Sequence, residues 1–234
     1  MKILIVAATQ GEIQSLKQSF SNHVVTPQLS RSILASQTID WLTTGIGMVN
    51  TGLLMGHYLA VYHPDVILHV GIGGSFDRSV PLGSVVYLTE DVYADMGADS
   101  PDGFLHLQEM GFPSLTKGTR SWYHRYTYKV PSFFPTIPRV SAITLNTVTG
   151  QDAEAHRLQS LWHATVETME GAAALQAATW AGIPCIGIRG ISNYVETRNK
   201  AGWKIALAIH HMQTHVAEVL SLPSNEILER KQRE

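Results

Sequence analysis

The sequence has little cysteine and little charge, and both shortages exclude classes of protein. Cys185 is the only cysteine among 234 residues, which excludes a disulfide framework and a cysteine-rich zinc site. Charged residues make up 15% of the chain and the formal net charge is -2. The charge balance therefore does not favour binding to nucleic acid.

Long apolar runs are also missing. No run reaches the roughly 18–20 residues that a membrane-spanning helix needs. Residues 1–10 contain one basic residue and a short apolar run, without the length or the cleavage site of a secretory signal. We therefore expect a cytoplasmic protein that binds neither membrane nor nucleic acid.

Strand-like and helix-like segments alternate along most of the chain. This alternation predicts an α/β protein, a three-layer α/β/α sandwich around a mixed, mostly parallel central sheet. No linker or repeat divides the chain, so we expect a single domain over residues 1–220 and a polar C-terminal tail over residues 221–234. The predicted strands are residues 2–8, 32–38, 39–43, 66–70, 84–88, 141–148, 164–167 and 184–191; the predicted helices are residues 12–20, 48–62, a helix capped by Thr149, 170–180 and 203–220.

Residues 95–138 break the regular pattern. They hold prolines at positions 101, 113, 131, 135 and 138, together with many aromatic residues. Long irregular excursions in a compact domain are usually functional. We therefore expect this stretch to serve the site.

Small and polar residues follow several of the predicted strands. In an open α/β sheet, ligands bind at the carboxyl ends of the strands, so these residues are expected to share one rim. The candidates are Glu12, Gly71, Gly73, Gly74, Thr149, Met169, Glu170, Arg189, Ser192 and Asn193.

Each candidate also has a purely structural interpretation, and the pattern alone leaves both open. Glu12 is either an acid that favours a helix N-terminus or a general base that activates water. Glu170 is either a surface acid or a carboxylate that accepts two hydrogen bonds from a vicinal diol such as ribose. Arg189 is either half of a buried ion pair or a site residue, and Asn193 is either a turn residue or a site residue. The glycines either form a tight turn or let a ligand approach the backbone.

Five segments in order resemble the nucleoside phosphorylase/nucleosidase superfamily, and most of all its methylthioadenosine/S-adenosylhomocysteine nucleosidases. They are residues 1–16, Gly45-Ile46-Gly47-Met48-Val49, Pro64-Asp65-Val66-Ile67, Glu167-Thr168-Met169-Glu170-Gly171 and Arg189-Gly190-Ile191-Ser192-Asn193. The resemblance implies that Glu12 activates water, that Ile46 lines the pocket for the 5′ end of the substrate and that Glu170 binds the ribose. We expect Arg189 to orient Glu170 or Glu12. The remaining expected substrate contacts are Gly73, Gly74, Thr149, Met169 and Ser192.

Asn193 stands where those nucleosidases have an aspartate that protonates the purine. This departure resembles a narrower group, the futalosine hydrolases, as do Trp203 and two longer segments. The segments are Thr144-Leu145-Asn146-Thr147-Val148-Thr149-Gly150 and Asp102-Gly103-Phe104-Leu105 followed by Glu109-Met110-Gly111-Phe112. The resemblance implies hydrolysis of futalosine to hypoxanthine and dehypoxanthinylfutalosine, a step of menaquinone biosynthesis, with no metal and no cofactor. It also implies a homo-oligomer, with a homodimer as the default.

The amide of Asn193 gives this narrower resemblance a chemical reason. An amide cannot act as the acid that protonates a 6-aminopurine, but it can donate and accept hydrogen bonds, which suits a 6-oxopurine such as hypoxanthine. Futalosine also has an aryl carboxylate at its 5′ end. We expect the irregular stretch to cover this tail, with Phe104, Phe112, Arg120 and Arg125 as candidates.

Two other functions stay open. The chain could be a methylthioadenosine/S-adenosylhomocysteine-type or other purine nucleosidase, or a phosphorylase. The first loop, residues 8–12, has no cation and places Glu12 where phosphate would be repelled, which favours water over phosphate. The chain could also be a non-catalytic purine-nucleoside sensor on the same scaffold. A sensor has no need of a water-activating acid, so Glu12 and Glu170 together favour an enzyme.

Overall fold

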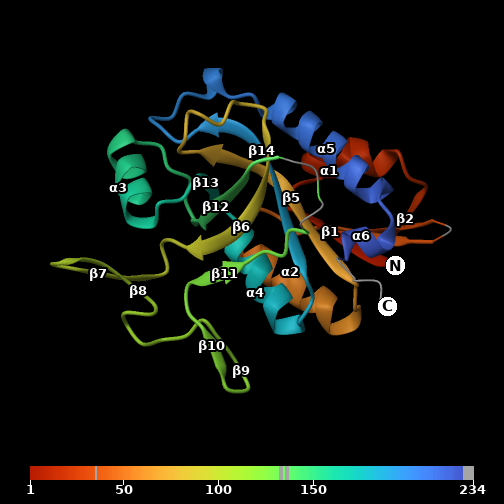
Figure 1. Ribbon diagram of the computed structural model, residues 1–234, viewed down its shortest axis with the longest axis horizontal. Helices are drawn as coiled ribbons and strands as arrows, with labels where there is room; N and C mark the ends of the chain where they lie inside the picture. Colours follow the sequence, from red (N-terminus) through yellow and green to blue (C-terminus); the bar gives the residue numbers. More distant parts are fainter. Residues whose placement is uncertain (35, 132–133, 135–136, 229–234) are drawn as a thin grey trace.

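The computed structural model describes residues 1–34, 36–131, 134 and 137–228, and it has a central sheet between two layers of helices (Figure 1). This arrangement confirms the predicted α/β fold class with a mixed central sheet. The sheet contains β1 (Lys2–Ala7), β2 (Asn22–Thr26), β3 (Leu29–Ile33), β4 (Thr38–Thr43), β5 (Val66–Ser75), β6 (Val85–Tyr93), β11 (Arg125–Thr127), β12 (Arg139–Thr144), β13 (Val166–Thr168) and β14 (Cys185–Tyr194).

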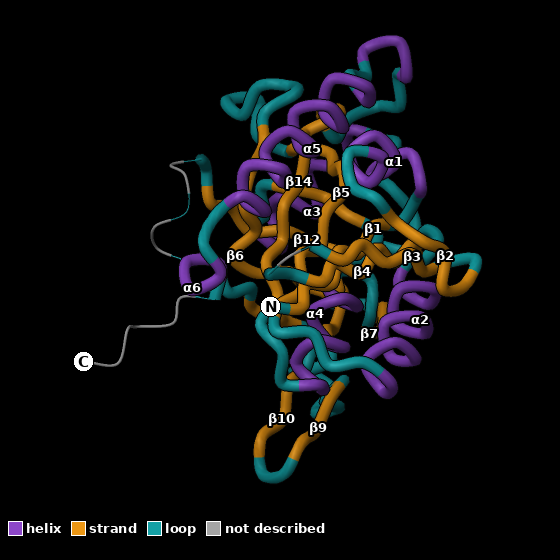
Figure 2. Tube along the Cα trace, turned by 90° about the vertical axis from the view of Figure 1, so that its right-hand side faces the viewer, coloured by secondary structure: helices purple, strands orange, loops and turns teal. Residues whose placement is uncertain are grey.

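Helices cover both faces of the sheet, as Figures 1 and 2 show. α1 (Gln10–Gln18) and α5 (Ile205–Ser221) pack on one face, and α2 (Met48–Val61) and α4 (Gly171–Ala181) pack on the other. α3 (Asp152–Trp162) lies beyond β12 and β13, where Leu158 and Trp162 join a smaller apolar cluster.

The alternation of side chains along β1 explains why both layers form. Leu4 belongs to the same buried cluster as Met55 of α2, whereas Ile5 belongs to the cluster that contains Met212 of α5. Successive side chains of a strand point to opposite faces of its sheet. A strand covered on both faces must therefore be apolar where it is covered, which is what residues 3–8 show in the sequence.

The sheet is more evenly mixed than the mostly parallel sheet that we predicted. β1 pairs in parallel with β4 and β5, β14 with β5, and β12 with both β6 and β13. The pairs β2–β3, β3–β4, β5–β13, β6–β11 and β6–β14 are antiparallel.

Five of these strands close into a ring at one end of the sheet. β5 pairs with β14, β14 with β6, β6 with β12, β12 with β13, and β13 with the end of β5. The last pair places Glu167 opposite Gly74. The ring therefore brings the segment that begins at Glu167 next to the ends of β5 and β14.

Of the two interpretations of the glycines after Val70, the structure excludes the tight turn. Gly71, Gly73 and Gly74 lie inside β5, which continues to Ser75. A Cβ on Gly73 would lie 2.8 Å from a methyl carbon of Val166 and 2.9 Å from the carbonyl oxygen of Glu167. Gly73 is needed because β5 and β13 approach too closely there for a side chain, and this ring closure is not visible in the local sequence.

Other elements differ from the prediction where local signals are weak. β2 is exposed along its whole length and shows no alternation that would reveal it. The irregular stretch contains the hairpins β7 (Gly97–Ser100)–β8 (Gly103–His106) and β9 (Leu115–Lys117)–β10 (Arg120–Trp122), as well as β11. Thr149 does not cap α3, because that helix begins at Asp152 with Gln151 at its N-cap.

The C-terminal segment begins with further ordered structure. A short 3-10 helix, η1 (Lys200–Gly202), precedes α5, and α6 (Ser224–Ile227) follows it. Ile227 lies in the segment expected to be a polar tail, yet it is 1% exposed and joins the cluster under α5. Residues 229–234 of that tail lie outside the described residues. Among the described helices, none combines the length and the apolar character needed to span a bilayer.

Replacing Gly190 by alanine is expected to destabilise the protein. A Cβ on Gly190, in β14, would lie 2.3 Å from the carbonyl oxygen of Ala208 in α5, so the helix would have to move away from the strand. Such overpacking costs about 1–3 kcal/mol and should lower Tm by several degrees in thermal unfolding. Gly202→Ala is the control, because a Cβ there meets no atom within 4 Å. Equal Tm values for the two variants would contradict this packing.

Candidate active site

A cavity of about 370 Å³ lies at the ends of β1, β5, β13 and β14. It is lined by nine of the ten residues expected to act on or bind the substrate: Glu12, Ile46, Gly73, Gly74, Thr149, Met169, Glu170, Ser192 and Asn193. The tenth, Arg189, lies outside the lining. Residues that are far apart in the sequence thus meet because the ring of strands gathers their loops.

Glu12 is held in one orientation by backbone and side-chain donors. Its Oε2 accepts hydrogen bonds from the backbone N–H of Thr9 at 2.9 Å and from the Thr9 hydroxyl at 3.0 Å, and its Oε1 accepts from the N–H of Ile72 at 3.1 Å. Glu12 is part of a capping box at the start of α1, so the structural interpretation is correct. Because the carboxylate also lines the cavity and is 7% exposed, it is also placed to act on a bound molecule.

Glu170 joins the start of α4 to the start of α2. Its Oε1 accepts a hydrogen bond from the N–H of Gly47 at 2.8 Å. Burial raises the pKa of Glu170, and this effect is opposed by the Gly47 hydrogen bond and by the positive charge of Arg189. No hydrogen bond to Oε2 is found within the described part of the chain, so this oxygen remains available to a ligand.

The amide of Asn193 is oriented by its neighbours. Oδ1 accepts a hydrogen bond from the Ser192 hydroxyl at 2.7 Å, and Nδ2 donates to the carbonyl oxygen of Tyr194 at 3.0 Å. The register of β14 against β5 shifts between Ile191 and Asn193. Such a bulge re-aims the side chains at the end of a strand, and here both Ser192 and Asn193 line the cavity. One N–H of the amide remains for a ligand.

Glu167 is a lining residue that sequence reasoning missed. Its two carboxylate oxygens accept hydrogen bonds from the backbone N–H of Thr149, at 3.0 Å, and from the Thr149 hydroxyl. Burial raises the pKa of Glu167 against these hydrogen bonds. Glu167 therefore fixes the loop after β12. The signal was present, since Glu167 precedes Glu170 in the same short motif.

Arg189 does not make the contacts expected of it. It is 1% exposed, and its Nη1 donates to the carbonyl oxygens of His69 at 2.8 Å and Ile188 at 3.0 Å. Among the described residues no ion pair joins Arg189 to Glu12, Glu170 or any other carboxylate. Its buried charge nevertheless opposes the rise in the pKa of Glu170, and it adds to the effect of burial in holding the pKa of His69 well below its usual value.

The irregular stretch does not cover this cavity in its own chain. Phe104 packs against Trp162, with ring centroids 6.3 Å apart, and Phe112 is 64% exposed. Arg120 stacks on Trp122, and Arg125 forms an ion pair with Glu90. None of the four predicted tail-binding residues lines the cavity.

A different segment of the chain lines the cavity in place of the irregular stretch. The loop after β14 and the start of α5 contribute Arg198, Trp203, Ile205 and Ile209 to the lining. Sequence reasoning noted only Trp203 among them. The described residues contain no group of three or more His, Cys, Asp or Glu side chains that could hold a metal ion.

Comparisons with known proteins show which family the chain belongs to. The model of the phosphorylase superfamily matches residues 2–221. The futalosine hydrolase of Acidothermus cellulolyticus is 29% identical over 215 residues, which cover 91% of this chain and 88% of that protein. The futalosine hydrolase of Thermus thermophilus is also 29% identical, over 77% of this chain and 80% of that protein.

A solved structure shares the fold. It is the 5′-methylthioadenosine/S-adenosylhomocysteine nucleosidase from Neisseria meningitidis in complex with methylthio-immucillin-A. It matches with a TM-score of 0.77 and 16% identity, over 94% of this chain and 98% of that chain.

Proposed function

The chain belongs to the phosphorylase superfamily, and from that premise we propose that it hydrolyses the N-glycosidic bond of futalosine. The products are hypoxanthine and dehypoxanthinylfutalosine, which places the reaction in the futalosine route of menaquinone biosynthesis. One observation supports this most. Glu12 and Glu170 share a cavity with the end of β14, where Asn193 presents an amide and not an acid.

Glu170 is the residue that we assign to the ribose. Its Oε1 is held by Gly47, and its Oε2 is free to accept hydrogen bonds from the 2′- and 3′-hydroxyls. Its negative charge also stabilises the oxocarbenium-like state that develops as the glycosidic bond lengthens. The start of α2 and the sugar are thereby connected through one side chain.

Glu12 is the residue that we assign to water. The two Thr9 donors and the Ile72 N–H fix the direction of its carboxylate. The carboxylate takes a proton from water as the water oxygen attacks the anomeric carbon, which is general base catalysis. Hydrolysis is favoured over phosphorolysis because the three acids of the lining, Glu12, Glu167 and Glu170, repel phosphate.

Asn193 is the residue that we assign to the leaving purine. The Ser192 and Tyr194 contacts leave one N–H of its amide to donate to an acceptor of the base. A 6-oxopurine offers O6 and N7 as acceptors, so the amide stabilises departing hypoxanthine without full proton transfer. Adenine presents a donor at position 6, and the mismatch leaves buried polar atoms unpaired.

A substrate panel tests this function. The protein is incubated with futalosine, inosine and methylthioadenosine, with and without phosphate, and free base is measured. We expect hypoxanthine from futalosine at a rate that does not depend on phosphate. Adenine release from methylthioadenosine as the main activity, a requirement for phosphate, or binding without any free base would each contradict the proposal. The last result would favour a sensor.

The single cysteine, Cys185, is free and buried, and we propose that the enzyme works in the cytoplasm.

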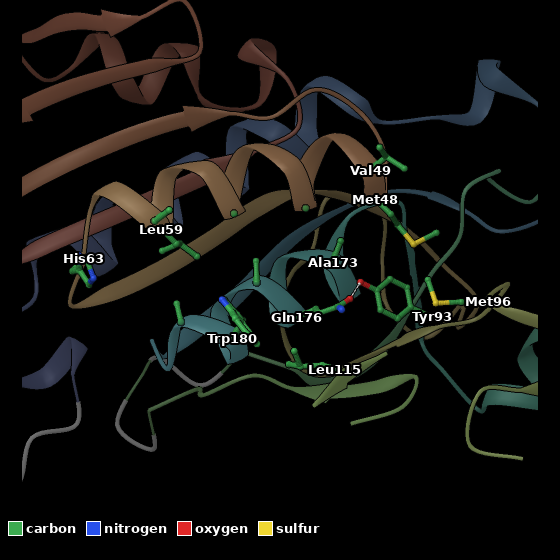
Figure 3. Close-up of a pocket in the computed structure, with 15 residues that line it drawn as sticks. Met48, Val49, Leu59, His63, Tyr93, Met96, Leu115, Ala173, Gln176 and Trp180 are labelled. Carbon is green, nitrogen blue, oxygen red and sulfur yellow. Dashed lines mark hydrogen bonds between the residues drawn. The ribbon is translucent and has the colours of Figure 1, made fainter. Parts of the chain in front are cut away.

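A second surface supports the proposal of a homodimer. A groove of about 560 Å³ runs between α2 and α4, and Figure 3 shows Met48, Val49, Leu59, Ala173 and Trp180 along it. Its described lining residues include only two titratable ones, His63 and Tyr93, so the groove is largely apolar. Val49 is 78% exposed and Trp180 is 60% exposed. An exposed apolar face of this kind marks an interaction site.

A second copy of the chain is the occupant that we propose for this groove. Gly52 and Gly56 face it, and a Cβ on either would meet no atom within 4 Å, so a partner helix can approach closely. Met96 and Leu115 of the irregular stretch also line the groove. The groove begins beside Gly47, which binds Glu170, so the partner lies next to the active site. A two-fold dimer pairs the same surface of both copies.

Trp180→Glu is expected to convert the dimer to a monomer. A charge in the centre of an apolar interface would be buried without a partner, whereas in the monomer the side chain at position 180 is mostly exposed and should not disturb folding. Sedimentation velocity measures the mass. Val24→Glu is the control, because Val24 is an equally exposed apolar residue on β2, away from the groove. A native protein that sediments as a monomer would contradict the proposal.

A further inference from the structure

Arg198 lies in a loop that is tied to the rim of the cavity. The backbone N–H of Arg198 donates to the carbonyl oxygen of Gly150 at 3.2 Å. The N–H of the preceding residue, Thr197, donates to Oδ1 of Asp152 at 2.6 Å. These two bonds fix the loop between β14 and η1 against the start of α3, so Arg198 has a defined position.

The side chain of Arg198 is held on an aromatic ring. Its guanidinium carbon lies 4.9 Å from the centroid of the Trp203 ring. Stacking on an indole face leaves the N–H groups at the edge of the guanidinium plane free to donate. Among the described carboxylates none forms an ion pair with Arg198. The guanidinium is therefore oriented and available for a bidentate contact with an anion.

The charge of the cavity makes this guanidinium distinctive. Glu12, Glu167 and Glu170 give the lining three acids, and Arg198 is its only Lys or Arg within the described residues. A substrate with a carboxylate is repelled by the acids unless its anionic end reaches a cation. Arg198 is the only lining residue that can offer this contact.

The apolar residues near Arg198 suit the remainder of a substrate tail that ends in a carboxylate. Trp203 and Ile205 line the cavity on the same side, and Ile205 is 40% exposed. Ile46 lines the cavity and is 57% exposed, so a further apolar side chain reaches solvent at the mouth. An aromatic ring with a carboxylate matches this combination of an apolar wall and one guanidinium.

We propose that Arg198, held against Trp203, binds the carboxylate at the 5′ end of the substrate and selects carboxylate-bearing nucleosides over neutral ones. This inference rests on the proposed function and extends it to the substrate tail. It assigns to the loop after β14 the role that the sequence led us to expect of residues 95–138. A contact to the carboxylate of the tail involves neither atom of the bond that breaks, so the proposal makes Arg198 a specificity residue rather than a catalytic one.

The test compares futalosine with its neutral methyl ester. In the native enzyme, kcat/KM for the free acid should exceed that for the ester by about 10- to 100-fold, as expected for a charge-assisted hydrogen bond. Arg198→Gln should bring this ratio close to one. Lys200→Gln is the matched control, because it removes a nearby exposed cation that does not line the cavity. It should keep the native ratio.

The possible failures separate the two claims. If Arg198→Gln cleaves futalosine with the native acid-to-ester ratio, the role of Arg198 is wrong and the proposed function stands. An equal loss of preference in Lys200→Gln would likewise overturn it, because general attraction would then explain the preference. If the native enzyme does not cleave futalosine at all, both claims fail. A Tm measured for each variant shows that the protein remains folded, which is expected because both side chains are exposed.

Discussion

Replacing Glu12 by glutamine is expected to lower kcat for futalosine by about 10²–10⁴-fold, the usual contribution of a positioned general base. Glutamine has nearly the same shape, but its amide cannot take the proton from the attacking water. Binding should change little, because Glu170 and Asn193 hold the sugar and the base in this account. The measurement is hypoxanthine release under saturating futalosine, with KM determined in parallel.

The control for this variant is Glu154→Gln. Glu154 is an acid on α3 whose carboxylate pairs with Arg157 at 2.7 Å and does not line the cavity. Its removal should leave kcat at the native value. Turnover by Glu12→Gln at the native rate would exclude Glu12 from the mechanism.

Asn193→Asp is expected to move the preference of the enzyme from 6-oxo to 6-amino purines. Nδ2 of Asn193 lies 3.0 Å from the carbonyl oxygen of Tyr194. A carboxylate oxygen at the same position would face that carbonyl, which favours a proton on the acid. A bound 6-aminopurine offers N7 as an alternative acceptor for this single proton, so the acid can turn its O–H from the carbonyl to N7 and then release the proton to the base. We expect the ratio of kcat/KM for futalosine to that for its 6-amino analogue to fall by about 10²-fold or more.

The control for Asn193→Asp is Asn199→Asp. It makes the same substitution six residues later, at an N-cap whose side-chain oxygen accepts from the N–H of Ala201 in either form. This variant should keep the native base preference. An unaltered ratio in Asn193→Asp would contradict the assignment of Asn193 to the leaving base.

The sequence predicted which side chains would line one cavity more accurately than it predicted the pairing of the strands. Glu12 and Asn193 each follow or end a buried strand, and the rule that ligands bind at strand ends holds for whatever path the chain takes between strands. The closed ring of strands depends on pairs such as Glu167 with Gly74, which are far apart in the sequence. No local pattern reports such a pair, so the sequence left open whether the glycines of β5 form a turn or let a ligand approach the backbone.

Arg198 and Glu167 were not predicted from the sequence, and the reason is the same for both. Arg198 lies on a loop whose position is set by hydrogen bonds from its backbone to Gly150 and from Thr197 to Asp152. Glu167 acts through Thr149, which was expected to cap a helix. In each case a tertiary contact decides which way the side chain points. Periodicity and motif spacing describe single elements and do not contain that information.

The most direct measurement is the fate of the solvent oxygen. Futalosine is turned over in water labelled with a heavy oxygen isotope, with phosphate present, and both products are analysed by mass spectrometry. We predict unlabelled hypoxanthine and a sugar product that holds the heavy oxygen at its anomeric carbon. A phosphorylated sugar, or no release of hypoxanthine from futalosine, would contradict water activation by Glu12 and recognition of a 6-oxopurine by Asn193.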